Sequence, residues 1–144
     1  MDLRPDILLA EDNISDAELF QMALQLNRST SRLHIVRDGV HALNFLQGGS
    51  VSMSAGPGIL PRLTLLDLNM PRIDGLEVLK QLRAHPGTRH LAVVIFSSSS
   101  ETTDRDQARR LGANDYLRKP NQFSELCAVV AQLERVWLSG GKTG

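Results

Sequence analysis

The sequence lacks several features that would place it in a specialised class of protein. It has one cysteine in 144 residues, which excludes a disulfide framework within the chain. Its 16 basic and 16 acidic side chains cancel, so no net charge draws it toward nucleic acid or an anionic membrane. No apolar run approaches the roughly 20 residues of a membrane span, and the N-terminus has no signal-peptide pattern. We therefore expect a soluble cytoplasmic protein that binds neither nucleic acid nor membrane.

Charge is also missing from one internal stretch. Residues 48–61 contain no charged side chain and are rich in Gly, Ser and Pro, which predicts a loop longer than the usual roughly 4–6 residues. Two interpretations of this loop remain open, a tolerated surface insertion and a contact with a partner or a second copy. The remaining pattern has no internal repeats, and it predicts one domain over residues 1–138 followed by a flexible tail over 139–144.

Short apolar segments alternate with helical patterns along the whole chain. Five such segments predict strands: Ile7–Ala10, Leu33–Val36, Leu63–Leu66, Leu91–Phe96 and Asp115–Lys119. The helix after the first strand has capping-box spacing from Ser15 to Glu18, and Leu19, Met22, Ala23 and Leu26 mark its apolar face. Asp38 is expected to cap the next helix, which ends at Gly48-Gly49. Five strands alternating with five helices predict an α/β fold, a doubly wound five-stranded parallel sheet.

The last predicted helix, over residues 122–138, has an unusually wide apolar surface. Phe123, Leu126, Val130, Leu133 and Trp137 form one stripe, and Val129 and Val136 lie beside it. A helix that packs against a sheet on one side does not need so wide a face. A subunit interface and simple burial are the two interpretations.

Polar groups follow the apolar segments where several strands end. Glu11 and Asp12 follow the first strand, Asp67 the third and Ser97 the fourth, and Lys119 ends the fifth. Open α/β sheets bind ligands at the carboxyl ends of their strands. Clustered carboxylates repel one another without a cation, and Mg²⁺ is the usual choice where a phosphate shares the site.

This constellation suits phosphoryl transfer. Asp67 would be the nucleophile that forms an acyl phosphate, Ser97 would donate a hydrogen bond to a phosphoryl oxygen, and Lys119 would pair with the phosphate. The structural alternative is that the acids only cap helices, and that Lys-Pro is a common dipeptide. The joint placement of these residues at successive strand ends favours the functional interpretation.

With these residues in place, the sequence resembles the receiver domain of two-component response regulators, which has the flavodoxin-like (βα)5 fold. The resemblance covers residues 7–138 and rests on Glu11-Asp12, Asp67 with Asn69-Met70-Pro71, Asp74-Gly75, Ser97 and Lys119-Pro120. Asp67 precedes Ser97 by 30 residues and Lys119 by 52. The resemblance implies that Asp67 accepts a phosphoryl group from a sensor histidine kinase. It also implies that Asp12, Asp67 and the backbone carbonyl of Asn69 bind Mg²⁺, with Glu11 contacting the ion through water.

The resemblance further implies a switch rather than an enzyme, with slow self-catalysed phosphorylation and dephosphorylation. The Ser97 hydroxyl would move toward the phosphate, and Tyr116 on the fifth strand would then turn inward. The bond before Pro120 would be cis, as is usual in the family. Asn69 and Ser99 occupy the positions that tune the lifetime of the phosphate in relatives.

Within the family, the chain looks most like the single-domain regulators paired with bacterial and cyanobacterial phytochromes. The residues that carry this similarity are Glu11-Asp12-Asn13, Val36-Arg37-Asp38-Gly39, Asp67 to Arg72, the long loop before the third strand, and Trp137-Leu138. It implies a bacteriophytochrome as the kinase and a homodimer through the fourth helix, fifth strand and fifth helix. Two departures are Ser97 in place of the more frequent Thr and the lack of charge in the 48–61 loop.

Other functions fit the sequence less well. The Gly140-Gly141-Lys142-Thr143 tail lacks the first glycine of a phosphate-binding P-loop, since Val136 stands there. A haloacid-dehalogenase-like phosphatase normally has an acid where Asn69 stands, and a flavin carrier would meet repulsion between its phosphate and Glu11-Asp12. We expect no output domain after the receiver pattern, and we therefore expect the chain to act through another protein. It would be a messenger, a relay intermediate that passes phosphate to a phosphotransfer protein, or a phosphate sink for its kinase.

Overall fold

The computed structural model describes residues 4–48 and 60–139 of the chain, and in these ranges five strands alternate with helices as predicted. The strands are β1 (Ile7–Ala10), β2 (Leu33–Val36), β3 (Leu63–Leu66), β4 (Val93–Ser97) and β5 (Asp115–Arg118). The helices are α1 (Ile14–Leu26), α2 (Gly39–Gln47), α3 (Gly75–Ala84), α4 (Thr102–Arg110) and α5 (Phe123–Leu133), and a π-helical segment, η1 (Glu134–Ser139), follows α5. Most of the expected 48–61 loop and of the expected tail lies outside the described residues.

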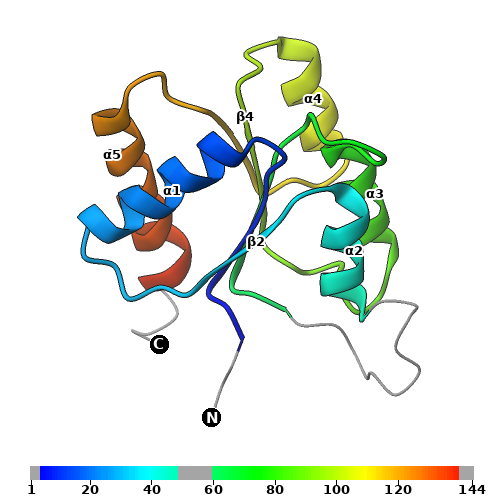
Figure 1. Ribbon diagram of the computed structural model, residues 1–144. Coiled ribbons are helices and arrows are strands. Elements are labelled where there is room, and N and C mark those ends of the chain that lie inside the picture. Colours follow the sequence, from blue (N-terminus) through cyan, green and yellow to red (C-terminus); the bar gives the residue numbers. More distant parts are fainter. Residues whose placement is uncertain (1–3, 49–59, 140–144) are drawn as a thin grey trace.

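The strands form one parallel sheet in the order β2-β1-β3-β4-β5. Helices α1 and α5 cover one face, and α2, α3 and α4 cover the other (Figure 1). Side chains of β1 and β3 point alternately into two cores, which explains why these strands are apolar without interruption. The predicted doubly wound fold is confirmed, and it brings the carboxyl ends of all five strands to one edge.

Helix α1 differs from the sequence prediction in its start and in its buried face. Asn13 caps the helix by accepting a hydrogen bond from the Asp16 backbone N–H at 3.0 Å, in place of the expected Ser15 capping box. The buried side chains are Ala17, Phe20, Ala23 and Leu24, whereas Leu19, Met22 and Leu26 are exposed. The helix carries apolar residues on two faces, and Phe20 decides between them because its large ring packs edge-on against Phe96.

The C-terminal helix also differs from the prediction. Regular α-helix ends at Leu133, and the following turn, Glu134–Ser139, is π-helical. Leu126, Val130 and Leu133 are buried, whereas Val136 is 56% exposed. Hydroxyl groups of Ser29 and Ser31 donate to the Glu134 carboxylate, which ties the end of α5 to the loop after α1. Among the described helices, none is long and apolar enough to cross a membrane.

Candidate functional site

Three carboxylates surround one ammonium group at the carboxyl edge of the sheet. Lys119, just beyond β5, places its Nζ 2.6 Å from Glu11 Oε1, 2.9 Å from Asp67 Oδ2 and 2.9 Å from Asp16 Oδ2. Glu11 follows β1 and Asp67 follows β3, so the parallel topology itself brings these side chains together. The structure therefore joins Glu11, Asp67 and Lys119 as the sequence predicted.

Burial makes this cluster strongly interacting. Glu11 and Asp67 are only 2% and 6% exposed. Burial raises the pKa of Glu11 to about 7; the hydrogen bond from Lys119 opposes this shift, and the nearby Asp67 adds to it. Burial alone would lower the pKa of Lys119, but its hydrogen bonds to Glu11, Asp67 and Asp16 outweigh that and raise the pKa above its usual value. The ammonium group thus stays charged among an excess of acids.

The loop after β3 is held tightly against Asp67. The Asn69 backbone N–H donates to Asp67 Oδ1 at 3.2 Å, and the Gly75 N–H donates to the Leu68 carbonyl at 3.0 Å. A Cβ at Gly75 would lie 2.3 Å from the Asp67 carbonyl oxygen, so only glycine permits this close approach. The Asp74 side chain caps α3 through the Glu77 N–H at 2.9 Å. The Asp74-Gly75 pair therefore positions the loop that carries Asn69.

The expected metal ligands have the chemistry that a hard cation requires. Asp12 and Asn69 line one cavity of about 430 Å³ together with Asp104, and Asp67 is not among the residues that line it. Among the described residues, no set of three or more His, Cys, Asp and Glu side chains is arranged to hold a metal ion. The predicted set is of another kind, with two carboxylates, one backbone carbonyl and water, and Mg²⁺ usually keeps several waters. An all-oxygen set of this composition fits Mg²⁺.

Ser97, Ser99 and Tyr116 form a connected path from β4 to β5. Ser97 is completely buried, and its Oγ accepts a hydrogen bond from the Ser99 N–H at 3.2 Å. The Tyr116 hydroxyl donates to the Ser99 carbonyl at 2.9 Å, and the ring is 7% exposed. Ser99 Oγ in turn donates to Asp104 of α4 at 2.6 Å. Tyr116 is thus buried in this structure rather than being a partly exposed edge aromatic.

The expectation of a cis bond before Pro120 is wrong for this structure. No cis peptide bond occurs in the described ranges 4–48 and 60–139, so the Lys119–Pro120 bond is trans. Trans is the favoured form of an X–Pro bond by about 0.5–1 kcal/mol.

The sequence interpretation missed two parts of this edge. The sequence pattern assigns no role to Asp16 in the first turn of α1, yet its carboxylate accepts a hydrogen bond from Lys119. Asp38, the cap of α2, also pairs with Arg72 of the β3–α3 loop at 2.7 Å, and His41 Nδ1 lies 2.9 Å from the same oxygen. Burial raises the pKa of Asp38, but the hydrogen bonds from Arg72 and His41 outweigh it and lower the pKa to about 2. Asp16 lies three residues beyond the Glu11-Asp12-Asn13 motif and Asp38 lies within Val36–Gly39, but their partners depend on backbone geometry.

The fold and this site define a receiver domain. Residues 7–131 match the family model described as the response regulator receiver domain, and the chain belongs to that family.

Among its relatives is the response regulator Rcp1 of Synechocystis sp., 35% identical over 133 residues that cover 92% of this chain and 88% of that protein. The probable methanogenesis regulatory protein FilR2 of Methanothrix harundinacea is 36% identical over 140 residues, covering 95% of this chain and 86% of the other.

Solved structures agree with this assignment. The phosphorylated cyanobacterial phytochrome response regulator RcpA superposes with a TM-score of 0.83 at 34% identity, over 95% of this chain and 96% of that one. The Mn²⁺-bound form of Rcp1 gives a TM-score of 0.80 at 34% identity, over 94% and 95% of the two chains. The chain is thus a receiver domain related to phytochrome response regulators.

Proposed function

We propose that this protein is a single-domain response regulator whose Asp67 accepts a phosphoryl group from a sensor histidine kinase in the presence of Mg²⁺. The observation that carries the proposal is the contact between Lys119 Nζ and the buried Asp67 Oδ2 at 2.9 Å, at the carboxyl edge of the sheet. A cation fixed beside a carboxylate nucleophile stabilises the negative charge of a phosphoryl group in transfer.

Each residue has a definite part in this chemistry. Asp67 attacks phosphorus, and Lys119 stabilises the charge on the arriving phosphoryl oxygens. Ser97 would donate its hydroxyl hydrogen to one of these oxygens. Asp12, Asp67 and the Asn69 carbonyl would hold Mg²⁺, with Glu11 contacting it through water, and the ion would neutralise charge shared between carboxylates and phosphate. Relatives with similar folds include a phosphorylated and a Mn²⁺-bound regulator, which supports this assignment.

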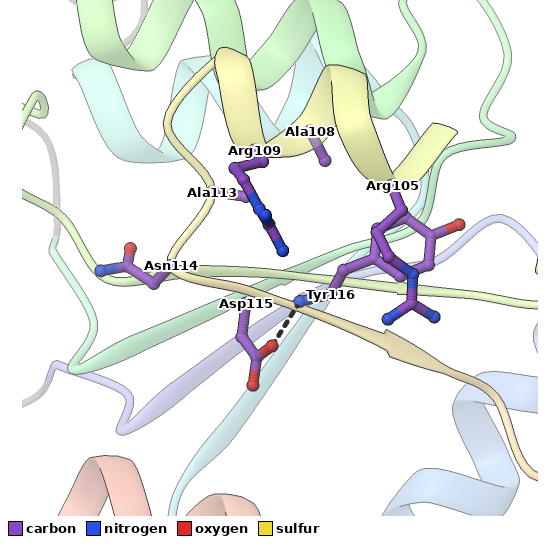
Figure 2. A pocket seen from close by; sticks show the side chains of 7 residues that line it. All are labelled: Arg105, Ala108, Arg109, Ala113, Asn114, Asp115 and Tyr116. Carbon is purple, nitrogen blue, oxygen red and sulfur yellow. Dashed lines mark hydrogen bonds between the residues drawn. The ribbon is translucent and has the colours of Figure 1, made fainter. Parts of the chain in front are cut away.

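The Ser97–Ser99–Tyr116 path would transmit phosphorylation to the surface of α4, β5 and α5. A shift of the Ser97 hydroxyl toward phosphate alters its bond with the Ser99 N–H, and Ser99 also contacts Tyr116 and Asp104. Figure 2 shows the outer end of this path, where Arg105 lies over the Tyr116 ring with its guanidinium carbon 5.0 Å from the ring centroid, near Arg109 and Asp115. This surface would bind an output partner or a second copy in a homodimer. Asn69 and Ser99 would set the lifetime of the phosphate.

The relatives favour a phytochrome as the kinase, because RcpA and a further similar structure, RtBRR, are described as phytochrome and bacteriophytochrome response regulators. The structure offers a surface for such a partner on α1. Met22 and Leu26 of α1 and Phe123 of α5 line a groove of about 320 Å³. Leu19 extends this apolar surface toward the N-terminal end of α1, where Asp16 contacts Lys119. An exposed apolar helix face next to the phosphoacceptor is suited to helices of a kinase that must bring a phosphohistidine to Asp67.

The decisive experiment is labelling with acetyl phosphate and Mg²⁺. The wild-type protein should gain one phosphoryl group, and Asp67→Asn should gain none, as measured by intact-protein mass spectrometry. Glu18→Gln serves as a control, because it removes an exposed carboxylate of α1 that is not part of the Lys119 cluster. Stoichiometric labelling of the Asp67→Asn variant would refute the assignment of the acceptor.

Two further experiments test the metal and the partner. Asp12→Ala should weaken Mg²⁺ binding in calorimetric titration, and an unchanged affinity would remove Asp12 from the ligands. Phosphotransfer profiling against candidate sensor kinases, with the decay of the phosphate followed over time, separates a messenger from a relay intermediate and from a phosphate sink. A relay intermediate would also pass its phosphate to a phosphotransfer protein.

A further inference from the structure

Lys119 uses its full hydrogen-bonding capacity before any phosphoryl group arrives. A lysine ammonium group has three N–H donors and no more. Its three close partners are Glu11, Asp16 and Asp67, at 2.6, 2.9 and 2.9 Å. A phosphoryl oxygen can therefore bond to Lys119 only if one of these carboxylates gives up its contact.

Asp16 is the partner that Lys119 can release most easily. Its side chain is 39% exposed, compared with 2% for Glu11 and 8% for Asp67. A carboxylate that loses its partner is destabilised least where water can hydrate it, so Asp16 is the least costly of the three to release. Asp16 and Lys119 also line a cavity of about 40 Å³ between α1 and the start of α5, which has room for water to hydrate the released group. The two buried acids, Glu11 and Asp67, do not line this cavity.

We propose that Asp16 is a positioning residue that restrains phosphoryl transfer by occupying one donor of Lys119 in the unphosphorylated protein. The inference rests on the proposed function of Asp67 as phosphoacceptor. In the reaction with acetyl phosphate, an Asp67 oxygen forms the new bond to phosphorus, and the bond between phosphorus and the bridging oxygen breaks. Acetate leaves with that electron pair. As the phosphoryl oxygens approach, the third Lys119 N–H passes from Asp16 to one of them.

The negative charge of Asp16 acts in the same direction. Its carboxylate and that of Asp67 share one ammonium nitrogen, so an anionic donor that approaches Asp67 is repelled by Asp16 at close range. A unit charge about 6 Å away in a partly hydrated site changes an energy by about 1 kcal/mol. Removal of the Asp16 charge should therefore speed the reaction, whereas loss of a merely structural contact should slow it.

The test compares Asp16→Asn with the wild type in phosphorylation by acetyl phosphate and by phosphoramidate, at equal Mg²⁺. Asp16→Asn keeps the shape of the side chain and should raise the rate with the dianionic acetyl phosphate about three- to tenfold, as the energy above converts to a rate. The increase with the less charged phosphoramidate should be smaller. Glu18→Gln is the matched control, because it removes one acidic charge from an exposed position of the same helix and should leave both rates unchanged.

A second measurement does not depend on phosphorylation. In protein without metal, the Lys119 ammonium protons should exchange with water faster in Asp16→Asn than in the wild type, as measured by NMR of ¹⁵N-labelled lysine. The inference would be overturned if acetyl phosphate phosphorylated Asp16→Asn no faster than the wild type. It would also be overturned if Glu18→Gln showed an equal increase in the phosphorylation rate. Failure of the wild type to be labelled would instead refute the proposed function itself.

Discussion

Two ion clusters lie at the same edge of the sheet and have opposite compositions. In the Lys119 cluster, three acids surround one cation, with Glu11 and Asp67 buried. In the Asp38 cluster, one buried acid is paired with Arg72 and contacts His41. The first cluster has too little positive charge for its acids, whereas the second has enough. A cluster that lacks positive charge is suited to take up a cation, and a satisfied one is suited to hold two loops together.

The pKa values of the two buried acids reflect this difference. The pKa of Glu11 is raised to about 7, and the pKa of Asp38 is lowered to about 2. A carboxylate with a raised pKa is charged in the folded state at a cost in stability, while one with a lowered pKa contributes stability in its charged form. The first cluster therefore holds charge at a cost in stability, and the second stabilises the loop that follows Asp67.

The largest expected effect comes from removing the cation of the first cluster. Lys119→Met would leave Glu11 and Asp67 buried without their partner, and breaking a buried pair in this way costs about 3–5 kcal/mol. Urea unfolding at pH 8 without divalent metal measures this loss, and added Mg²⁺ should recover part of it. Lys80→Met, at an exposed position of α3, should change the free energy of unfolding by less than about 0.5 kcal/mol. Equal effects of the two substitutions would contradict the comparison.

The pH dependence of stability should be next in size. Because the folded-state pKa of Glu11 is raised from 4.5 to about 7, the folded protein binds more protons than the unfolded chain between these values. Stability without metal should therefore fall by about 2–3 kcal/mol as pH rises from 4.5 through 7. In Glu11→Gln this fall should disappear, as chemical unfolding with a chelator present would measure. A fall that persists unchanged in Glu11→Gln would assign it to another group.

The second cluster should respond to pH in the opposite direction. Asp38→Asn keeps the capping oxygen for the His41 N–H but removes the charge that binds Arg72, and should lower the free energy of unfolding at pH 7 by about 1 kcal/mol. The folded-state pKa of Asp38 is lowered from 3.8 to about 2. The difference in the free energy of unfolding between wild type and Asp38→Asn is therefore fully present above pH 3.8 and is lost as pH falls through 2. A difference from wild type that is the same at pH 7 and pH 2 would show that the charge is irrelevant.

The first cluster was largely predictable from the sequence and the second was not. Glu11, Asp67 and Lys119 each follow or end a strand, and a parallel sheet fixes where such ends meet. The contact of Asp38 with Arg72 depends on the backbone at Arg72, which has a left-handed φ of 69°. Non-glycine residues are uncommon there, so the sequence pattern does not predict it.

The rotation of α1 about its own axis explains why the sequence did not predict the contact of Asp16 with Lys119. The side chain of Asp16 reaches Lys119 only because α1 turns Phe20 toward the sheet and leaves Leu19 and Met22 exposed. Its apolar residues occupy two faces, so periodicity alone did not settle the rotation of the helix. The same uncertainty applied to the C-terminal helix, where the π-helical turn changes the direction of Val136 and Trp137. Strand positions follow from topology, whereas helix faces depend on which large side chain the core accepts.

The smallest expected effect concerns Arg72, whose ion pair with Asp38 and whose left-handed backbone act on stability in opposite directions. Its pairing with Asp38 stabilises the loop, whereas its left-handed backbone destabilises it, and a non-glycine residue in that conformation costs about 1–2 kcal/mol. Arg72→Ala loses the ion pair and keeps the strain, so it should be less stable than wild type by about 0.5–1 kcal/mol.

Arg72→Gly also loses the ion pair but releases the strain, and should therefore be more stable than Arg72→Ala by about 0.5–1 kcal/mol, after allowance for the greater freedom of glycine in the unfolded chain. Thermal unfolding of the three proteins at pH 7 measures both differences. If the alanine variant matched the glycine variant, the left-handed backbone would carry no strain, and the Asp38 pair would have nothing to offset. A satisfied cluster that offsets strain in the loop after Asp67 holds that loop in place, and this distinguishes it from the charge-deficient cluster around Lys119.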